Sequence, residues 1–188
     1  MKKIAVYCGA ASGNDKIYQK SALQLADWLV ANDLELVYGG GKVGLMGILA
    51  SEVRLQGGIV HGVITQELYD RKTAFKDCDL QIVSDMSVRK KTMLDLSDGC
   101  IALPGGPGTL EEIIEAFSWA RLGDNSNPSA FFNVAGYYDP LKTMFDQMTN
   151  KEFLSVEDRE KLLFSDSLDN IYHFMENYIP PKIRTYAK

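Results

Sequence analysis

The residues with the clearest chemical potential lie in "PGGPGTLEE", at positions 104–112. Gly105, Gly106 and Gly108 let the backbone come close to a ligand, because glycine carries no Cβ. Thr109 is suited to cap the helix that should follow, and the first N–H groups of that helix carry the positive end of its dipole. A short apolar strand at 100–103 precedes the glycines. This order of strand, glycine loop and helix start predicts a turn that binds phosphate.

Glu112 has two interpretations. Thr109 and Glu112 have the spacing of a capping box, in which the carboxylate turns back to the N–H of the capping residue. Alternatively the carboxylate faces the ligand, and it then needs a nearby cation because a bound phosphate is also negative. Arg89 can supply that cation, since it falls within the apolar stripe of an expected helix that starts at Met86. The run 89–91 is equally consistent with a solvated charged face on which the guanidinium group of Arg89 stays in water.

A second glycine cluster, Gly39–Gly44 ("GGGKVG"), follows another apolar strand. It matches the G-x-G-x-x-G pattern of dinucleotide-binding turns, with Glu67 roughly 20 residues further on. The alternative is a tight strand-to-helix turn that needs small residues and binds no ligand. A Walker loop is excluded, because Lys42 is not followed by Ser or Thr. Two turns of this kind at one sheet edge favour a compact nucleotide over an extended dinucleotide.

Strand-like and helix-like segments alternate along the whole chain, which predicts an α/β fold with a doubly wound parallel sheet and helices on both faces. We expect a single domain over residues 1–188, with ligands at the carboxyl ends of the strands. The aperiodic stretch 65–77 is a candidate functional loop. The expected strands are 4–8, 34–38, 58–65, 79–85, 100–104, one within 129–139, and 162–164. The expected helices are 18–31, 45–56, 86–97, 109–122, 140–149 and 167–178.

Composition narrows the class of protein. The net charge of -5 and the pI near 5.1 argue against nucleic acid as a partner, because a phosphate backbone is bound by clustered Lys and Arg. The three cysteines form no C-x-x-C pair and no cluster with histidine, so neither a disulfide framework nor a metal site is expected. No apolar run reaches the roughly 18 residues of a membrane span, and "MKKIAVYCGA" is too short for a signal peptide. These features indicate a cytoplasmic protein with no membrane partner.

Several motifs resemble the LOG (Lonely Guy) family of cytokinin-activating phosphoribohydrolases, often mislabelled as lysine decarboxylases. They are "VYGGGKVGLMG", "RKKTM", "LPGGPGTLEE", "WARLG" and "FFNVAGYYDPL", in the family's order and spacing. The resemblance covers nearly the whole chain. It implies a Rossmann-like homodimer that cleaves the N-glycosidic bond of a nucleoside 5'-monophosphate and releases free base and ribose 5-phosphate. No cofactor and no metal are implied.

The resemblance also assigns roles to residues. Arg89 and Glu112 correspond to the family's catalytic pair. The expected substrate-binding residues are Gly105, Gly106, Gly108, Thr109, Lys90, Glu67, Gly41 and Ser12. Positive charge builds on the ribose as the base leaves, and a carboxylate near C1' can stabilise it and orient or deprotonate water. We expect Glu112 to do this while Arg89 keeps it ionised and helps to neutralise the phosphate.

Some positions depart from the family pattern: Ser87 and Val88 before the Arg-Lys pair, 124–127 after "WARLG", and Ala10 and Ala11 after Cys8. They leave the proposed acid and phosphate site intact, and the preference between N6-substituted and plain adenosine monophosphate stays open.

Two other classes of function remain. A nucleotide or molybdenum-cofactor carrier of the same fold needs the phosphate loop, but no carboxylate at C1'. A dinucleotide-dependent oxidoreductase needs a hydride-transfer acid, and neither His61 nor His173 lies in a convincing motif. A lysine decarboxylase is disfavoured, because no lysine has an obvious cofactor-anchoring context.

Overall fold

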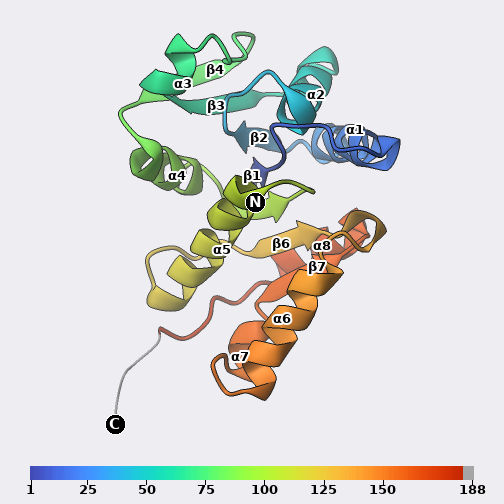
Figure 1. Ribbon diagram of the computed structural model, residues 1–188, viewed down its shortest axis with the longest axis vertical. Helices are drawn as coiled ribbons and strands as arrows, with labels where there is room; N and C mark the ends of the chain where they lie inside the picture. The colour runs from blue at the N-terminus through green and yellow to red at the C-terminus, as the bar shows by residue number, and fades with distance from the viewer. Residues whose placement is uncertain (184–188) are drawn as a thin grey trace.

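A seven-stranded sheet forms the centre of the computed structural model, which describes residues 1–183 (Figure 1). The strand order is β4-β3-β2-β1-β5-β6-β7, and every pair is parallel. The strands are β1 (Lys3–Tyr7), β2 (Glu35–Tyr38), β3 (Val60–Thr65), β4 (Asp79–Val83), β5 (Gly99–Ala102), β6 (Ser129–Phe132) and β7 (Leu162–Ser165). The predicted α/β fold with a parallel sheet is confirmed.

Helices cover both faces of this sheet. They are α1 (Lys16–Ala31), α2 (Gly44–Leu55), α3 (Gln66–Asp70), α4 (Met86–Asp95), α5 (Pro107–Leu122), α6 (Asp139–Asn150), α7 (Val156–Arg159) and α8 (Leu168–Glu176), with a 3-10 turn η1 (Val134–Gly136). Figure 1 shows α1 and α2 on one side of the sheet and α4 on the other. Among the described residues, no helix is long and apolar enough to cross a membrane.

The strands are apolar on both sides because each side faces a separate core. Ile4 and Val6 of β1 join the core beneath α1, α2 and α8, whereas Ala5 and Tyr7 join the core beneath α4, α5 and α6. This alternation follows from the two-residue repeat of a strand. It explains why β1 reads as a continuous apolar run rather than as alternating apolar and polar residues.

The direction of winding reverses at β1. Val6 pairs with Tyr38 of β2 on one side and with Ile101 of β5 on the other. The chain first builds outward through β2, β3 and β4, and then returns to add β5, β6 and β7. The loops that follow β1 and β5 therefore diverge and leave a crevice at the carboxyl ends of these strands, which is where such sheets bind ligands.

The helix starts follow from local capping. The carboxylate of Asp85 accepts a hydrogen bond from the N–H of Val88 at 2.9 Å and begins α4. Helix α5 begins at Pro107, with Gly106 as the N-cap, because proline at the first helical position loses no hydrogen bond. The prediction that Thr109 caps this helix is wrong: Thr109 lies within its first turn and is buried.

The segment 65–77 is more ordered than its lack of periodicity indicates. The hydroxyl of Thr65 caps the short helix α3 by accepting from the N–H of Leu68 at 3.3 Å. Ala74 then forms an isolated antiparallel bridge with Gly41. Helices α3 and α7 were not expected from the sequence, since neither is long enough to show a helical repeat.

Candidate functional site

Two adjoining cavities occupy the crevice between β1 and β5. The first, called the loop cavity, has a volume of about 390 Å³ and is lined by 9–13 after β1, by 104–106 after β5, and by Tyr18, Leu45 and Tyr137. The second, called the acid cavity, has about 240 Å³ and contains Arg89, Glu112 and the first turn of α5. Ala10 and Gly106 line both. A ligand can therefore extend from one cavity into the other.

The glycine loop after β5 is held from both sides. The N–H of Gly9 donates to the carbonyl oxygen of Pro104 at 3.1 Å. The hydroxyl of Tyr137 donates to the carbonyl oxygen of Gly105, and that of Tyr138 to the carbonyl oxygen of Leu103, each at 2.7 Å. These bonds fix the path of the backbone before any ligand binds.

Gly105 is needed because of close packing. A Cβ at this position would lie 2.1 Å from Oγ1 of Thr109 and 2.9 Å from the backbone nitrogen of Gly9. By contrast, a Cβ at Gly106 or Gly108 would meet nothing within 4 Å. The backbone of 106–108 therefore faces open space, beside the positive end of the α5 dipole.

Arg89 is buried, with 6% of its surface exposed, and it joins three segments of the chain. Its Nε donates to the carbonyl oxygen of Val63 in β3 at 2.9 Å, and its Nη2 donates to that of Gly39 after β2 at 3.3 Å. Its Nη1 donates to Oε1 of Glu112 in α5 at 2.8 Å. The alternative in which Arg89 lies on a solvated face is wrong.

The contact with Arg89 explains why residue 39 is a glycine. A Cβ there would lie 1.9 Å from Nη2 of Arg89. At least one glycine of the cluster 39–44 therefore makes room for the guanidinium, which accounts for part of the G-x-G-x-x-G match without a dinucleotide.

Glu112 faces the acid cavity rather than its own main chain. Among residues 1–183, the hydrogen bond to its carboxylate comes from Arg89, and no capping box forms. Only 12% of its side chain is exposed. Burial raises the pKa of Glu112 above its ordinary value, and the Arg89 guanidinium opposes this rise. The carboxylate is thus poised to take up a proton more readily than an exposed glutamate does.

The other sequence-predicted residues lie at varying distances from this pair. Ser12 lines the loop cavity, and Gly41 packs against Met46, which lines the acid cavity. The ammonium of Lys90 binds Glu111 at 2.8 Å and Glu115 at 2.7 Å. It therefore supports α5 beside the site, and it lines neither cavity.

Glu67 is also placed away from the two cavities. It pairs with Arg71 one turn later on the chain, and its side chain is 75% exposed. The described residues contain no group of three or more His, Cys, Asp or Glu side chains placed to hold a metal ion.

Sequence reasoning missed the aromatic wall of the loop cavity. Tyr18 and Tyr137 line it, with their ring centroids 5.7 Å apart in an edge-to-face arrangement. Tyr137 belongs to the "FFNVAGYYDPL" motif, whose tyrosines carry no recognisable chemical pattern of their own.

His61 lies at the opposite end of the sheet, at the amino ends of the strands. Its Nε2 is 2.7 Å from a carboxylate oxygen of Glu35, and its Nδ1 is 3.1 Å from one of Asp79. The hydrogen bond from His61 is the main reason that the pKa of Glu35 falls to about 2. This cluster ties the first residues of β2, β3 and β4 together and is remote from the cavities.

Comparison with known proteins identifies a matching family model and similar plant proteins. Residues 46–175 match the family model described as "Possible lysine decarboxylase". The probable cytokinin riboside 5'-monophosphate phosphoribohydrolase LOGL2 of Oryza sativa subsp. japonica is 38% identical over 188 residues, which are 100% of this chain and 77% of the relative. The cytokinin riboside 5'-monophosphate phosphoribohydrolase LOG1 of Arabidopsis thaliana is also 38% identical, over 100% of this chain and 88% of its own.

Solved structures share the fold at low sequence identity. The molybdenum cofactor carrier protein of Chlamydomonas reinhardtii superposes with a TM-score of 0.69 at 15% identity, over 93% of this chain and 96% of the other. The molybdenum cofactor binding protein of Rippkaea orientalis gives 0.67 at 18%, over 94% and 96%. These similarities show the fold alone. The family model and the relatives that match over the whole of this chain show that the chain belongs to the LOG family, whose curated members include cytokinin riboside 5'-monophosphate phosphoribohydrolases.

Proposed function

We propose that this protein hydrolyses the N-glycosidic bond of an adenosine 5'-monophosphate, with or without an N6 substituent, and releases the free base and ribose 5-phosphate. One observation carries the proposal. The buried Arg89–Glu112 pair opens into the same cavity as the first turn of α5, where the backbone is exposed to a ligand. The names of the relatives from Oryza sativa and Arabidopsis thaliana, which describe phosphoribohydrolases of cytokinin riboside 5'-monophosphates, support the same reaction.

The 5'-phosphate is held at the start of α5 in this proposal. The backbone of Gly105, Gly106 and Gly108 and the side chain of Thr109 surround it, and the helix dipole favours its negative charge. The phosphate does not react. Its binding energy positions the ribose so that C1' lies at the carboxylate of Glu112.

Glu112 acts on the reacting atoms. The C1'–N bond breaks, and the base leaves with the bonding electrons while positive charge develops on the ribose. The ionised carboxylate stabilises this charge and accepts a proton from the water that forms the new C1'–O bond. The departing base takes up one proton, so the sum of the reaction is the addition of water. Arg89 acts through Glu112, because its guanidinium favours the ionised form that the reaction needs.

The roles of the remaining predicted residues stay proposals. We propose that Ser12, which lines the loop cavity, and Gly41, which packs against Met46, contact the substrate. We propose that Lys90 supports α5 through its two carboxylate partners, which differs from the direct substrate contact implied by the family resemblance. Glu67 reaches the substrate only if its segment moves or a second subunit brings it close.

We further propose that the chain is a single domain in the cytoplasm and acts as a homodimer. Met86 and Val88, at the start of α4, are 46% and 43% exposed and supply apolar surface for a partner. Phe117 supplies no surface for a partner, because it is 3% exposed and lies in the core. Analytical ultracentrifugation measures the assembly directly.

The variant Glu112→Gln tests the proposed reaction. Gln keeps the size of the side chain and an acceptor for Arg89 but cannot take a proton from water. We expect kcat for release of base from adenosine monophosphate to fall at least about 10³-fold, while nucleotide binding is retained. Chromatography of the free base and calorimetry of binding measure the two effects.

Glu115→Gln is the matched control. Glu115 lies on the same helix three residues after Glu112, pairs with Lys90, and lines neither the loop cavity nor the acid cavity. Its variant should keep nearly full activity. If the wild-type protein binds nucleoside monophosphates but releases base from none of them, the carrier interpretation replaces the hydrolase.

A further inference from the structure

A third cavity, of about 660 Å³, shares no lining residue with the loop cavity or the acid cavity. We call it the lysine cavity, because Lys42, Lys72 and Lys76 line it together with the aromatic residues Tyr69 and Phe75. It lies between the loop after β2 and the segment that follows α3. Its volume falls within the range of about 300–1,000 Å³ typical of small-molecule sites.

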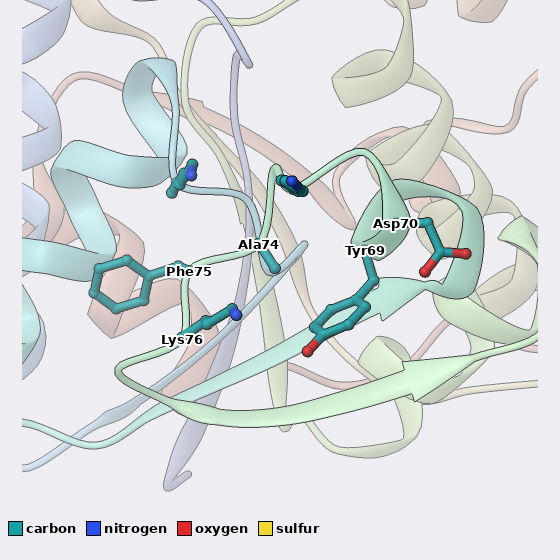
Figure 2. Close-up of a pocket in the computed structure, with 7 residues that line it drawn as sticks. Tyr69, Asp70, Ala74, Phe75 and Lys76 are labelled. Atoms are coloured by element: carbon teal, nitrogen blue, oxygen red, sulfur yellow. The ribbon is translucent and has the colours of Figure 1, made fainter.

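The lysine cavity carries a net positive charge, because three lysines and one aspartate line it. None of its three lysines forms an ion pair with a carboxylate in residues 1–183. The single lining carboxylate, Asp70, accepts a hydrogen bond from Gln66 at 2.8 Å. Figure 2 shows Asp70 on the far side of Tyr69 from Lys76 and Phe75. Three exposed lysines therefore line one hollow in a chain whose net charge is -5.

The aromatic residues give the cavity apolar surface for a flat group. Tyr69 and Phe75 are partly buried, and the ammonium of Lys76 lies 5.9 Å from the centroid of the Tyr69 ring. Figure 2 shows the Tyr69 ring and Lys76 converging on the same space. A ligand with several negative charges at one end and an aromatic ring at the other matches both kinds of lining.

The backbone around the lysines is held in place without a ligand. The N–H of Lys42 donates to the carbonyl oxygen of Thr73, and that of Phe75 to the carbonyl oxygen of Gly40, each at 2.9 Å. The bridge between Gly41 and Ala74 lies between these bonds. The two walls of the cavity are therefore fixed to each other, which lowers the cost of ordering them around a ligand.

We propose that the lysine cavity is a second ligand site, which binds a nucleoside di- or triphosphate. The lysines bind the phosphate chain, and the Tyr69 ring contacts the base; the Phe75 ring is turned away and packs against the core beneath α1 and α2 (Figure 2). The site is distinct from the monophosphate site proposed above, and it would exist even if that site catalysed no hydrolysis.

The test is calorimetric titration of the wild-type protein with ADP, and of a Lys72→Ala/Lys76→Ala double variant. Charge-assisted hydrogen bonds from two lysines should be worth at least about a tenfold loss of ADP affinity. The KM for adenosine monophosphate should change less than about twofold, because the cavities share no residue. The control is Lys20→Ala/Lys142→Ala, which removes the same charge from exposed positions elsewhere and should change neither quantity.

The other outcomes overturn the proposal. ADP binding that the double variant leaves unchanged, with ADP competing against the monophosphate, places ADP in the catalytic site. An absence of saturable binding at millimolar ADP removes the site altogether. Inorganic pyrophosphate that binds as tightly as ADP refutes the proposed contact between Tyr69 and the base.

Should the double variant not fold, Lys76→Gln alone is expected to weaken ADP binding about threefold. Base release from adenosine monophosphate is measured separately, so a failure of the proposed hydrolysis remains distinguishable.

Discussion

Replacing Arg89 by methionine tests whether its charge controls the proton on Glu112. Methionine fills much of the same volume without a charge. Nη1 of Arg89 lies 2.8 Å from Oε1 of Glu112, and the two side chains are only 8% and 12% exposed. Burial already raises the pKa of Glu112, and the guanidinium is the first opposing influence. Its removal must raise that pKa further.

The size of the effect follows from the distance and the burial. Two unit charges about 4 Å apart attract by about 4 kcal/mol at an effective dielectric constant near 20. This attraction limits the loss of kcat/KM at neutral pH to about 10³-fold, since each 1.4 kcal/mol corresponds to tenfold. The carbonyl oxygens of Val63 and Gly39 also lose their donor, so we expect the free energy of unfolding to fall by about 3–5 kcal/mol.

The assay is the pH dependence of kcat/KM for release of base. In the wild-type protein the ionised carboxylate is needed, so activity should fall as pH decreases through a pKa above the ordinary glutamate value. In Arg89→Met this acid limb should move to higher pH. Lys91→Met is the matched control, because Lys91 lies on the same helix, is half exposed and pairs only with Asp95 among the described residues.

An unchanged acid limb in a folded Arg89→Met protein would refute the reasoning, because Glu112 would then keep its ionisation without the guanidinium. If the methionine variant does not fold, Arg89→Lys replaces it. Lysine keeps the charge but cannot donate to three acceptors at once. It should move the acid limb in the same direction by a smaller amount.

Three further variants test the supporting structure. Glu35→Gln should lower the free energy of unfolding by about 1–2 kcal/mol at neutral pH, because the hydrogen bond from His61, together with Lys2 and Lys3, lowers the pKa of Glu35 from 4.5 to about 2. This stabilisation is present above pH 4.5 and is lost as the pH falls toward 2, as urea titrations at several pH values will show. Gly105→Ala should raise the KM for nucleotide at least about tenfold, because the new Cβ would displace Thr109 or the β1 loop. Tyr138→Phe should cost about 1 kcal/mol of stability, measured by thermal denaturation, because a buried hydrogen bond to the glycine loop is lost.

For the first two of these variants, a specific result would contradict the expectation. Equal stability of wild type and Glu35→Gln from pH 3 to pH 7 would remove the cluster around His61 as a stabilising feature. A Gly105→Ala protein with unchanged KM would show that this loop does not hold the phosphate. Gly106→Ala is its folding control, since a Cβ there meets nothing within 4 Å.

The sequence predicted the sheet well because parallel strands buried on both faces are short apolar runs. For this reason β1 was predicted to within one residue at each end, and the glycine loop was correctly placed after β5. The start of α5 was placed two residues late, because Thr109 resembles a cap whereas Pro107 begins the helix. Local patterns did not distinguish two acceptable starts that lie so close together.

The candidate site was predictable only in part. Arg89 and Glu112 are 23 residues apart, and no local pattern distinguishes their pairing from a charged run and a capping box. The pairing depends on β3, α4 and α5 being docked, which is a property of the tertiary structure. The tyrosines at 18, 137 and 138 were missed for the same reason. Tyr137 and Tyr138 bond to the backbone of 103–105 from distant parts of the chain, and Tyr18 packs against Tyr137.

The three hydrogen bonds of Arg89 have a consequence for how activity arises during folding. Its partners come from β3, the turn after β2 and α5, so they meet only when both halves of the sheet have assembled around β1. A partly assembled chain would leave Glu112 in water, with the proton affinity of any surface acid. Activity should therefore return during refolding no earlier than the docking of α5, and a newly made chain should cleave no nucleotide before α5 has been made.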